Sequence, residues 1–198
     1  MPKLGMKPIR KAALVDATIT EIGRAGSLDV TVSQIARRAG MSSALAHHYF
    51  GSKEQIFLAA MRHVLATHGA EVRGALSAAD SARGRLNGIV RASFAASSFR
   101  REVIGAWLNF YVLAQTQPEA RRLLRVYQRR LHSNLCHALR PIIGAPADHV
   151  ARGLGAMIDG VYIREALKSG RPDGAAAAAA VLAHLERELG SAGLSERA

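Results

Sequence analysis

The chain has 198 residues, of which 49% are hydrophobic and 21% are charged, and this balance excludes a disordered chain and is typical of a folded globular protein. Its formal net charge of +12 favours a polyanionic partner, although the excess of Lys and Arg is spread along the whole sequence. The single Cys136 excludes an intramolecular disulfide, and the lack of a signal peptide or of about 18 consecutive apolar residues predicts a cytoplasmic protein outside the membrane.

The spacing of apolar residues predicts an all-α protein of about nine helices, because no run alternates well enough for a strand. The first helix is expected to begin at Pro8 and to end at Gly26. Two short helices and the start of a long helix at Ser52 follow. The later helices are expected at residues 81–98, 101–116, 118–140, 147–169 and 173–189. The small and polar segment that begins at Gly74 predicts a domain boundary near residue 70, which separates domains 1–70 and 71–198.

Residues 31–53 have the pattern of two helices that flank a tight turn. Thr31 and Gln34 have the spacing of a capping box, so a helix is expected to begin near Val32. Gly40 can end that helix with a positive φ, and Ser42 can cap the next one. A buried hairpin is the alternative, but basic residues cluster around the turn: Arg37, Arg38, His47, His48 and Lys53. The pattern therefore predicts a helix-turn-helix that binds DNA.

The second helix of this motif would lie in the major groove, where side chains near its beginning face the base edges. The predicted base-facing residues are Ser43, Ala44, Leu45 and His47. Hydroxyls and basic groups at helix beginnings favour phosphate, and the predicted phosphate contacts are Thr31, Ser42, His48, Tyr49 and Lys53. Phe50 is expected to be core. We predict no metal site, because adjacent helical residues such as His47 and His48 point about 100° apart.

Several blocks resemble a known family. The spacing A-x3-G-x-S followed by H-Y-F-x-x-K resembles the DNA-binding domain of TetR-type regulators. The blocks MPKLGMKPIR, QIARRAG, HYF, MRH, AWL, RRLHSNL and IDG resemble the BetI-type repressors, which control glycine betaine synthesis from choline. The sequence departs from that pattern at Ala44 and Ala46, where a glycine and a bulky aliphatic residue are expected, and at Tyr111, where a tryptophan is expected.

This resemblance implies an N-terminal helix-turn-helix domain and a C-terminal domain for effector binding and dimerisation. It implies double-stranded operator DNA as partner, choline or a related quaternary ammonium as effector, and no cofactor. It also implies a homodimer formed by the last two long helices, whose apolar faces could instead pack within one chain. Those faces comprise Leu154, Met157, Ile158, Val161, Val181, Leu182 and Leu185.

Choline has no N–H group, so a protein must recognise its cation by aromatic faces and a nearby negative charge. Trp107, Phe110 and Tyr111 have helical spacing, which fits either an ordinary core or such faces, and Tyr162 could add another. Asp159 is the candidate acid, because it is the only acid in the run 154–163. An exposed Asp159, or one bonded to nearby backbone, is equally consistent with the sequence. Glu102 and Glu165 are the alternatives, and each stands beside an Arg.

The sequence contains no nucleophile elbow, Gly-rich phosphate loop or metal-spaced Cys/His set, so we do not expect an enzyme. The prediction is a sequence-specific, DNA-binding repressor of glycine betaine biosynthesis genes that choline relieves. The alternative is a TetR-type repressor that responds to another cationic or apolar small molecule, for example one that controls efflux.

Overall fold

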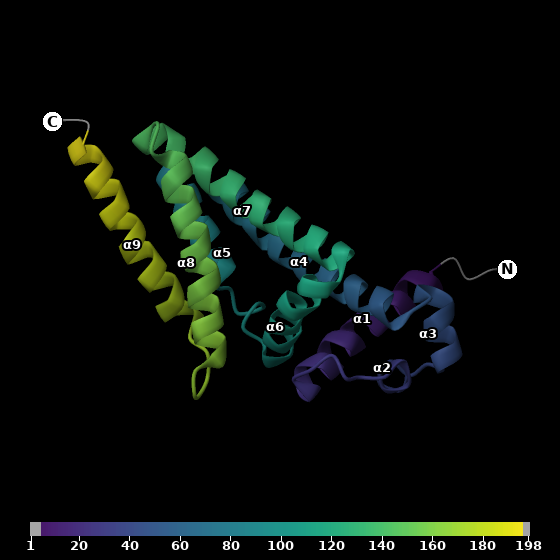
Figure 1. Cartoon of the computed structure of the whole chain (residues 1–198). Helices are drawn as coiled ribbons and strands as arrows, with labels where there is room; N and C mark the ends of the chain where they lie inside the picture. Colours follow the sequence, from purple (N-terminus) through teal and green to yellow (C-terminus); the bar gives the residue numbers. More distant parts are fainter. Residues whose placement is uncertain (1–4, 196–198) are drawn as a thin grey trace. The chain divides into compact units, whose positions relative to one another are not determined.

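The computed structural model describes the backbone of residues 5–195 and the side chains of residues 5–191. Within this part of the chain there are nine α-helices and no β-strand, which confirms the predicted all-α class (Figure 1). The first four residues of the MPKLGMKPIR block lie outside the described residues. The helices are α1 (Met6–Ala25), α2 (Val32–Arg38), α3 (Ser43–Phe50), α4 (Lys53–Ala78), α5 (Ala82–Ser93), α6 (Arg101–Thr116), α7 (Pro118–Ile143), α8 (Ala147–Leu167) and α9 (Gly174–Ser195).

Most helix starts lie within one residue of the prediction and α6 has the predicted bounds, whereas several helix ends differ. Helix α1 begins at Met6 rather than Pro8, and its last residue is followed by the predicted Gly26, whose φ of 66° is the left-handed conformation expected at a helix end. Helix α4 continues past Gly74 to Ala78, so the small residues expected to interrupt the chain are helical. Helices α8 and α9 end at Leu167 and Ser195 rather than at residues 169 and 189.

Two predicted helix ends were wrong for identifiable reasons. Helix α5 stops at Ser93 because Phe94, which is only 4% exposed, turns its side chain into the core and its amide donates to the carbonyl of Arg91. Helix α7 contains Pro141 and continues to Ile143, although proline removes one helical hydrogen bond. The side chains of Leu139 and Ile143 are buried, and this burial stabilises the last turn.

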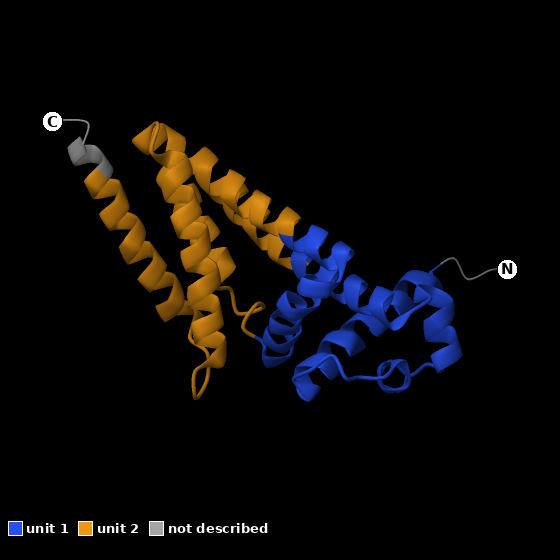
Figure 2. Ribbon diagram, in the orientation of Figure 1, with its two compact units in different colours: residues 1–66, 100–124 blue, residues 67–99, 125–198 orange. Residues whose placement is uncertain are grey.

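The chain forms two compact units (Figure 2). Unit 1 comprises residues 1–66 and 100–124, and unit 2 comprises residues 67–99 and 125–198. In unit 1, α1 packs against α2 and α6, and α2 packs against α3. The core of this unit includes the fully buried side chains of Leu14, Ile35 and Ala46.

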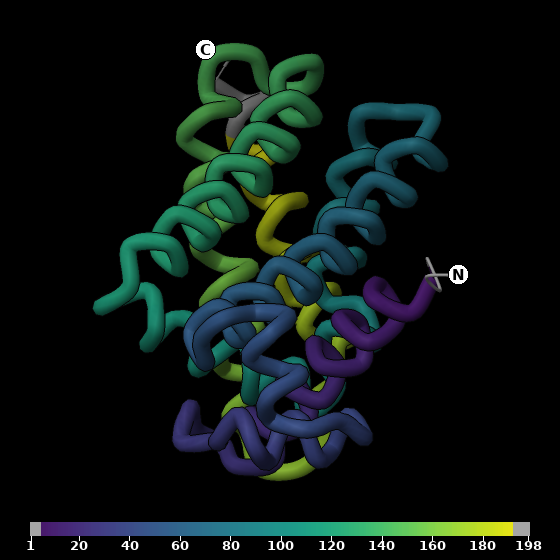
Figure 3. The backbone as a smooth tube through the Cα atoms, turned by 90° about the vertical axis from the view of Figure 1, so that its right-hand side faces the viewer, coloured from purple at the N-terminus to yellow at the C-terminus, as the bar shows by residue number. Residues whose placement is uncertain are grey.

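In unit 2, α9 packs against both α5 and α8, and α8 and α9 lie side by side (Figure 3). Leu86, Leu154 and Leu185 are fully buried, one from each of these helices. Cys136 is buried. None of the described helices combines the length and apolar character that a membrane crossing requires.

Candidate DNA-binding helices and effector-binding residues

The caps of α2 and α3 are those predicted from the sequence. The Thr31 hydroxyl accepts a hydrogen bond from the Gln34 amide, and the Gln34 side chain accepts from the Thr31 amide at 2.7 Å, which completes a capping box. Gly40 has a φ of 67° in the turn, and the Ser42 hydroxyl accepts from the Leu45 amide at 3.3 Å. Local side-chain hydrogen bonds therefore fix the beginning of each helix, and the tight turn between them needs glycine.

Helix α3 has one buried face and one exposed face. Ala46 is fully buried, whereas Ala44, His47 and His48 are exposed. Ser43, Leu45, Tyr49 and Phe50 are half-buried, so the expectation that Phe50 is core holds only in part. The four predicted base-facing residues therefore all retain surface on the outside of the motif. The departure at Ala46 lies on the inner face, where a small side chain allows α3 to pack closely.

Several contacts orient the side chains around the exposed face. The hydroxyls of Ser33 and Ser43 lie 2.9 Å apart and share a hydrogen bond between α2 and α3. Nδ1 of His47 lies 3.0 Å from the Gly51 carbonyl oxygen, and the rings of His48 and Tyr49 are in contact, with their centroids 5.6 Å apart. Ser43, His47, His48 and Tyr49 therefore each have a contact within or beside the helix pair.

Lys53 lies at the beginning of α4, where the Ser52 hydroxyl accepts from the Gln55 amide at 3.3 Å. Its Nζ lies 5.4 Å from the centroid of the Phe57 ring, a distance at which a cation and an aromatic face attract. Thr31 is the cap residue of α2 and is exposed. Both residues thus lie at helix beginnings, where backbone amides and the helix dipole favour anions.

The three aromatic residues on α6 belong to unit 1 and contact one another as their spacing predicted. Trp107 and Phe110 are buried, and Tyr111 is half-buried. The Trp107 Nε1–H donates to the Tyr111 hydroxyl at 3.2 Å, and the two rings meet edge to face with centroids 5.9 Å apart. The cluster therefore has the core position that the sequence left open as the ordinary interpretation, while Tyr111 keeps some accessible surface.

Asp159 on α8 belongs to unit 2 and is bonded to a side chain that sequence reasoning missed. The Tyr127 hydroxyl on α7 donates to Oδ1 of Asp159 at 2.9 Å. Burial raises the pKa of the Asp159 carboxyl, and the hydrogen bond from Tyr127 works in the opposite direction. Asp159 is therefore neither exposed nor bonded only to its own backbone. It is a half-buried acid whose negative charge lacks a full counterion among the described residues.

The two alternative acids are engaged elsewhere. Glu102 lies 4.0 Å from Arg100, and Glu165 pairs with Lys168 rather than with the neighbouring Arg164. Tyr162, the other predicted residue on α8, donates its hydroxyl to the Ser98 carbonyl oxygen at 2.8 Å. Its ring lies 5.1 Å from that of Phe99. Tyr162 is therefore buried, with its ring against Phe99 and its hydroxyl committed.

Glu71 on α4 is a second acid that the sequence did not single out. Its Oε1 accepts a hydrogen bond from the Ser97 hydroxyl. Its Oε2 is buried and has no hydrogen-bond partner among the described residues. His68, one turn earlier, has a lowered pKa because it is buried, although the charge of Glu71 acts to raise it. No local motif marks Glu71, since its partner is 26 residues away.

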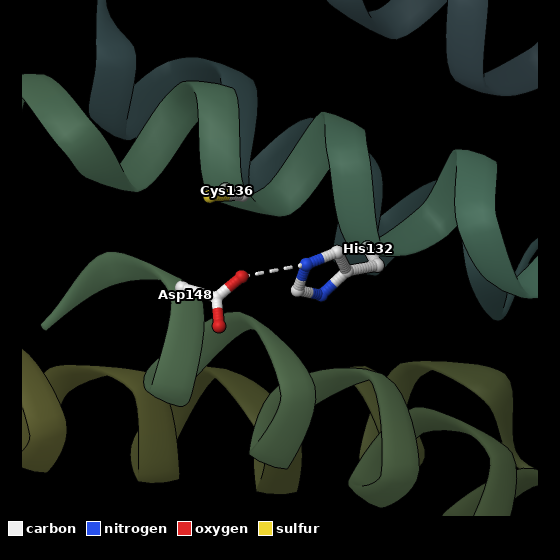
Figure 4. Close-up of side chains that lie close together, drawn as sticks. All are labelled: His132, Cys136 and Asp148. Carbon is white, nitrogen blue, oxygen red and sulfur yellow. Dashed lines mark hydrogen bonds and ion pairs between the residues drawn. The ribbon is translucent and has the colours of Figure 1, made fainter.

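A further cluster joins α7 to the beginning of α8. His132 and Asp148 face each other across the two helices, with Nε2 and Oδ1 3.1 Å apart, and Cys136 lies one turn from His132 (Figure 4). Ligand atoms of the three residues lie within 4.8 Å of one another, and their types could hold a metal ion. Asp148 also pairs with Arg152, and this contact is the main cause of its lowered pKa. His132, Asp148 and Arg152 thus form an ion-pair network that links α7 to α8.

Both parts of the chain match known protein families. Residues 14–60 match the tetR family of bacterial regulatory proteins, and residues 82–190 match the C-terminal part of BetI-type transcriptional repressors. The chain is 50% identical over 190 residues to the HTH-type transcriptional regulator BetI of Brucella melitensis biotype 2, and the alignment covers 96% of each chain. It is 51% identical over 170 residues to the regulator of the same name from Rhizobium meliloti strain 1021, covering 85% of this chain and 84% of the relative.

Solved structures have the same fold. A transcriptional regulator from Pseudomonas aeruginosa PAO1 aligns with a TM-score of 0.79 at 24% identity, over 93% of this chain and 92% of that one. A transcriptional regulator from Saccharomonospora viridis, solved in complex with choline, aligns with a TM-score of 0.78 at 23% identity, over 89% of this chain and 95% of that one. The chain therefore belongs to the TetR family, with a C-terminal part of the BetI type, and it is a transcriptional repressor and not an enzyme.

Proposed function

We propose that the protein represses genes for glycine betaine biosynthesis from choline, and that choline relieves the repression. The names of the relatives that are half identical support the regulatory role, and the choline complex of the Saccharomonospora viridis regulator supports the effector. One observation from this chain supports a cationic effector most strongly: Asp159 is a half-buried carboxylate, in a protein of net charge +12, whose described side-chain partner is the neutral phenol of Tyr127.

On the DNA side, we propose that residues 1–70 bind the operator and that residues 71–198 serve effector binding and dimerisation. The exposed face of α3 would read base edges with Ser43, Ala44, Leu45 and His47. Ala44 and Leu45 suit thymine methyl groups. The proposed phosphate contacts are Thr31, Ser42, His48, Tyr49 and Lys53, which would set the register of α3 without reading sequence.

We propose that the repressor is a homodimer joined through α8 and α9. Leu154, Ile158, Val181 and Leu185 are already buried within one chain, so these side chains are not free for a partner. Small residues remain exposed on both helices: Gly153, Ala156 and Gly160 on α8, and Ala176, Ala179, Ala180 and Ala183 on α9. Helices with small residues can approach closely, which suits a two-fold four-helix interface.

Such a dimer would place its two recognition helices about 34 Å apart, or a multiple of that spacing, on one face of a palindromic site. Sedimentation equilibrium of the purified full chain is expected to give twice the mass of one chain at micromolar concentration. A single species with the mass of one chain at that concentration would contradict the dimer.

The effector is tested by titration calorimetry with choline, betaine aldehyde and glycine betaine, together with release of DNA taken from upstream of betaine-synthesis genes. We expect choline to bind and to weaken the complex with DNA. The effector residues proposed from the sequence are Asp159 and Tyr162 in unit 2, and Trp107, Phe110 and Tyr111 in unit 1, whose part in the response is tested separately. If the protein binds that DNA but none of the three compounds, the family remains and the effector is another cationic or apolar molecule.

A further inference from the structure

A circuit of neighbouring residues links four elements of unit 2: α4, the segment after α5, α8 and α7. His68 and Glu71 lie one turn apart on α4, and Glu71 accepts a hydrogen bond from Ser97 in the segment after α5. The next residue, Ser98, accepts a hydrogen bond from Tyr162 on α8 through its carbonyl oxygen. The circuit thus passes from α4 to α8 through two consecutive residues.

The other half of the circuit returns from α8 to α4. Asp159 lies one turn before Tyr162, so the two residues share a side of α8. Asp159 accepts a hydrogen bond from Tyr127 on α7, whose ring meets the His68 ring edge to face with centroids 5.6 Å apart. Three helices and one loop therefore converge. We call these residues the effector ring: His68, Glu71, Ser97, Ser98, Tyr127, Asp159 and Tyr162.

The two phenols of the effector ring are hydrogen-bonded, whereas one carboxylate oxygen has no donor among the described residues. Tyr127 donates to Asp159, and Tyr162 donates to the backbone, so both phenols have used their hydrogens. Oε1 of Glu71 is bonded to Ser97, but its Oε2 is buried without a donor among the described residues. A buried carboxylate oxygen without a donor is strongly destabilising, so such an oxygen points to a ligand that supplies one.

The effector ring also contains more acidic than basic side chains. It contains two acids and, as its only group that can become cationic, His68. Burial lowers the pKa of His68, which therefore remains neutral at neutral pH and does not offset the acids. The rings of Tyr127 and Tyr162 add aromatic surface. Two carboxylates beside aromatic faces suit an organic cation, and the unused oxygen of Glu71 requires that this cation also have a hydrogen-bond donor.

We propose that the effector ring binds choline with its hydroxyl group donated to Oε2 of Glu71 and its trimethylammonium group beside Asp159 and the Tyr127 and Tyr162 rings. This inference rests on the proposed function and adds Glu71 as the residue that recognises the hydroxyl end. The assignment follows from chemistry, because a quaternary ammonium has no N–H and the hydroxyl is the only hydrogen-bond donor in choline.

The arrangement has a consequence for selectivity. Tetramethylammonium has the same type of cation but no hydroxyl, so it leaves Glu71 without a donor. Glycine betaine has a carboxylate in place of the hydroxymethyl group, and this carboxylate would face Glu71 with the same sign of charge. The expected order of affinity is choline, then tetramethylammonium, then glycine betaine.

Titration calorimetry on the full chain tests this order. The wild type is expected to bind choline at least about tenfold more tightly than tetramethylammonium, which is the effect of one hydrogen bond to a charged acceptor. Glu71→Leu removes the acceptor and is expected to bring the ratio of the two affinities close to one. Glu71→Gln keeps a neutral acceptor and is expected to give an intermediate ratio, and it serves if Glu71→Leu does not fold. Glu119→Gln, at an exposed residue on α7, makes the same change of charge and is expected to keep the wild-type ratio.

The results separate this inference from the proposed function. If the wild type binds choline and both Glu71 variants keep the wild-type ratio, the role of Glu71 is wrong and choline remains the effector. A wild-type ratio near one also overturns the role of Glu71. If the wild type binds neither compound, the choline effector is wrong, and the inference about Glu71 is wrong with it.

Discussion

Gly23 on α1 lies directly against Gly105 on α6, with no side chain between the two backbones. A Cβ on Gly105 would lie 2.8 Å from the Cα of Gly23, and a Cβ on Gly23 would lie 2.3 Å from the Cα of Glu102. Asn109 strengthens the same contact by donating from Nδ2 to the Gly26 carbonyl at 3.2 Å and to the Gly105 carbonyl at 2.9 Å. The helix before the DNA-binding pair is thus joined to α6 by backbone contact.

Gly23→Ala is expected to destabilise the protein by about 1 to 3 kcal/mol. The added methyl group forces α1 away from α6, and the cost of this movement exceeds the gain in helix propensity of about 1 kcal/mol. Urea unfolding followed by circular dichroism measures the change as a lower midpoint. Gly74→Ala is the matched control, since a Cβ there meets no atom within 4 Å and the substitution should be neutral or stabilising. Equal midpoints for the two variants would contradict the close contact.

Lys53→Ala is expected to weaken binding to operator and to random DNA alike, because a phosphate contact carries no sequence information. The slope of log affinity against log salt should fall in magnitude by about 1, which fluorescence anisotropy at several salt concentrations measures. Lys168→Ala removes the same charge from unit 2, where Lys168 pairs with Glu165, and should leave the slope unchanged. An unchanged slope for Lys53→Ala would remove Lys53 from the phosphate contacts. Changes at Ser43 or His47 should instead alter sequence preference.

Trp107→Ala is expected to keep operator affinity and to lose the response to choline. Trp107 belongs to the unit that holds the DNA-binding helices, and its Nε1–H donates to Tyr111, so its loss is expected to remove much of the coupling between effector and DNA, which is typically about 1 to 3 kcal/mol. Trp107 is buried, so the variant should also lose stability, by about 3 to 5 kcal/mol.

Melting curves must therefore show that the Trp107→Ala variant is folded, and Trp107→Phe is the milder control that keeps a ring. DNA release is measured at increasing choline concentration. If a folded Trp107→Ala variant releases the operator at the wild-type concentration, Trp107 is only part of the core.

Choline binding is expected to strengthen as pH rises through the raised pKa of Asp159, because the ionised carboxylate binds the cation. Without effector the sign for stability is opposite. The folded state holds the Asp159 proton to higher pH than the unfolded state, so this group lowers stability as pH rises from its ordinary pKa of 3.8 through the raised value. Titration calorimetry at several pH values should show that the affinity for choline rises with pH in the wild type. The rise should be absent in Asp159→Asn. An identical pH profile for the two proteins would contradict it.

The sequence predicted the parts that depend on neighbours in the chain. The caps at Thr31 and Ser42 join residues three apart, so composition and spacing were enough to place them. The Tyr127–Asp159 bond joins residues 32 apart, and the Glu71–Ser97 bond joins residues 26 apart. No periodicity encodes such pairs, because they depend on how helices pack. The same reason explains why Pro141 did not end α7, since burial of Ile143 outweighed a local rule.

Helix α3 has eight residues, fewer than the roughly 12 to 15 that an isolated helix needs to be stable in water. Its shape is therefore supplied by the Ser42 cap and by Ala46, which is fully buried against its surroundings. The outward positions at Ala44 and His47 contribute little to that support. If α3 reads the operator as proposed, a lineage could exchange these outward side chains and acquire a new operator while its fold remained unchanged, whereas a bulkier residue at Ala46 would tilt the whole helix and alter every proposed base contact together.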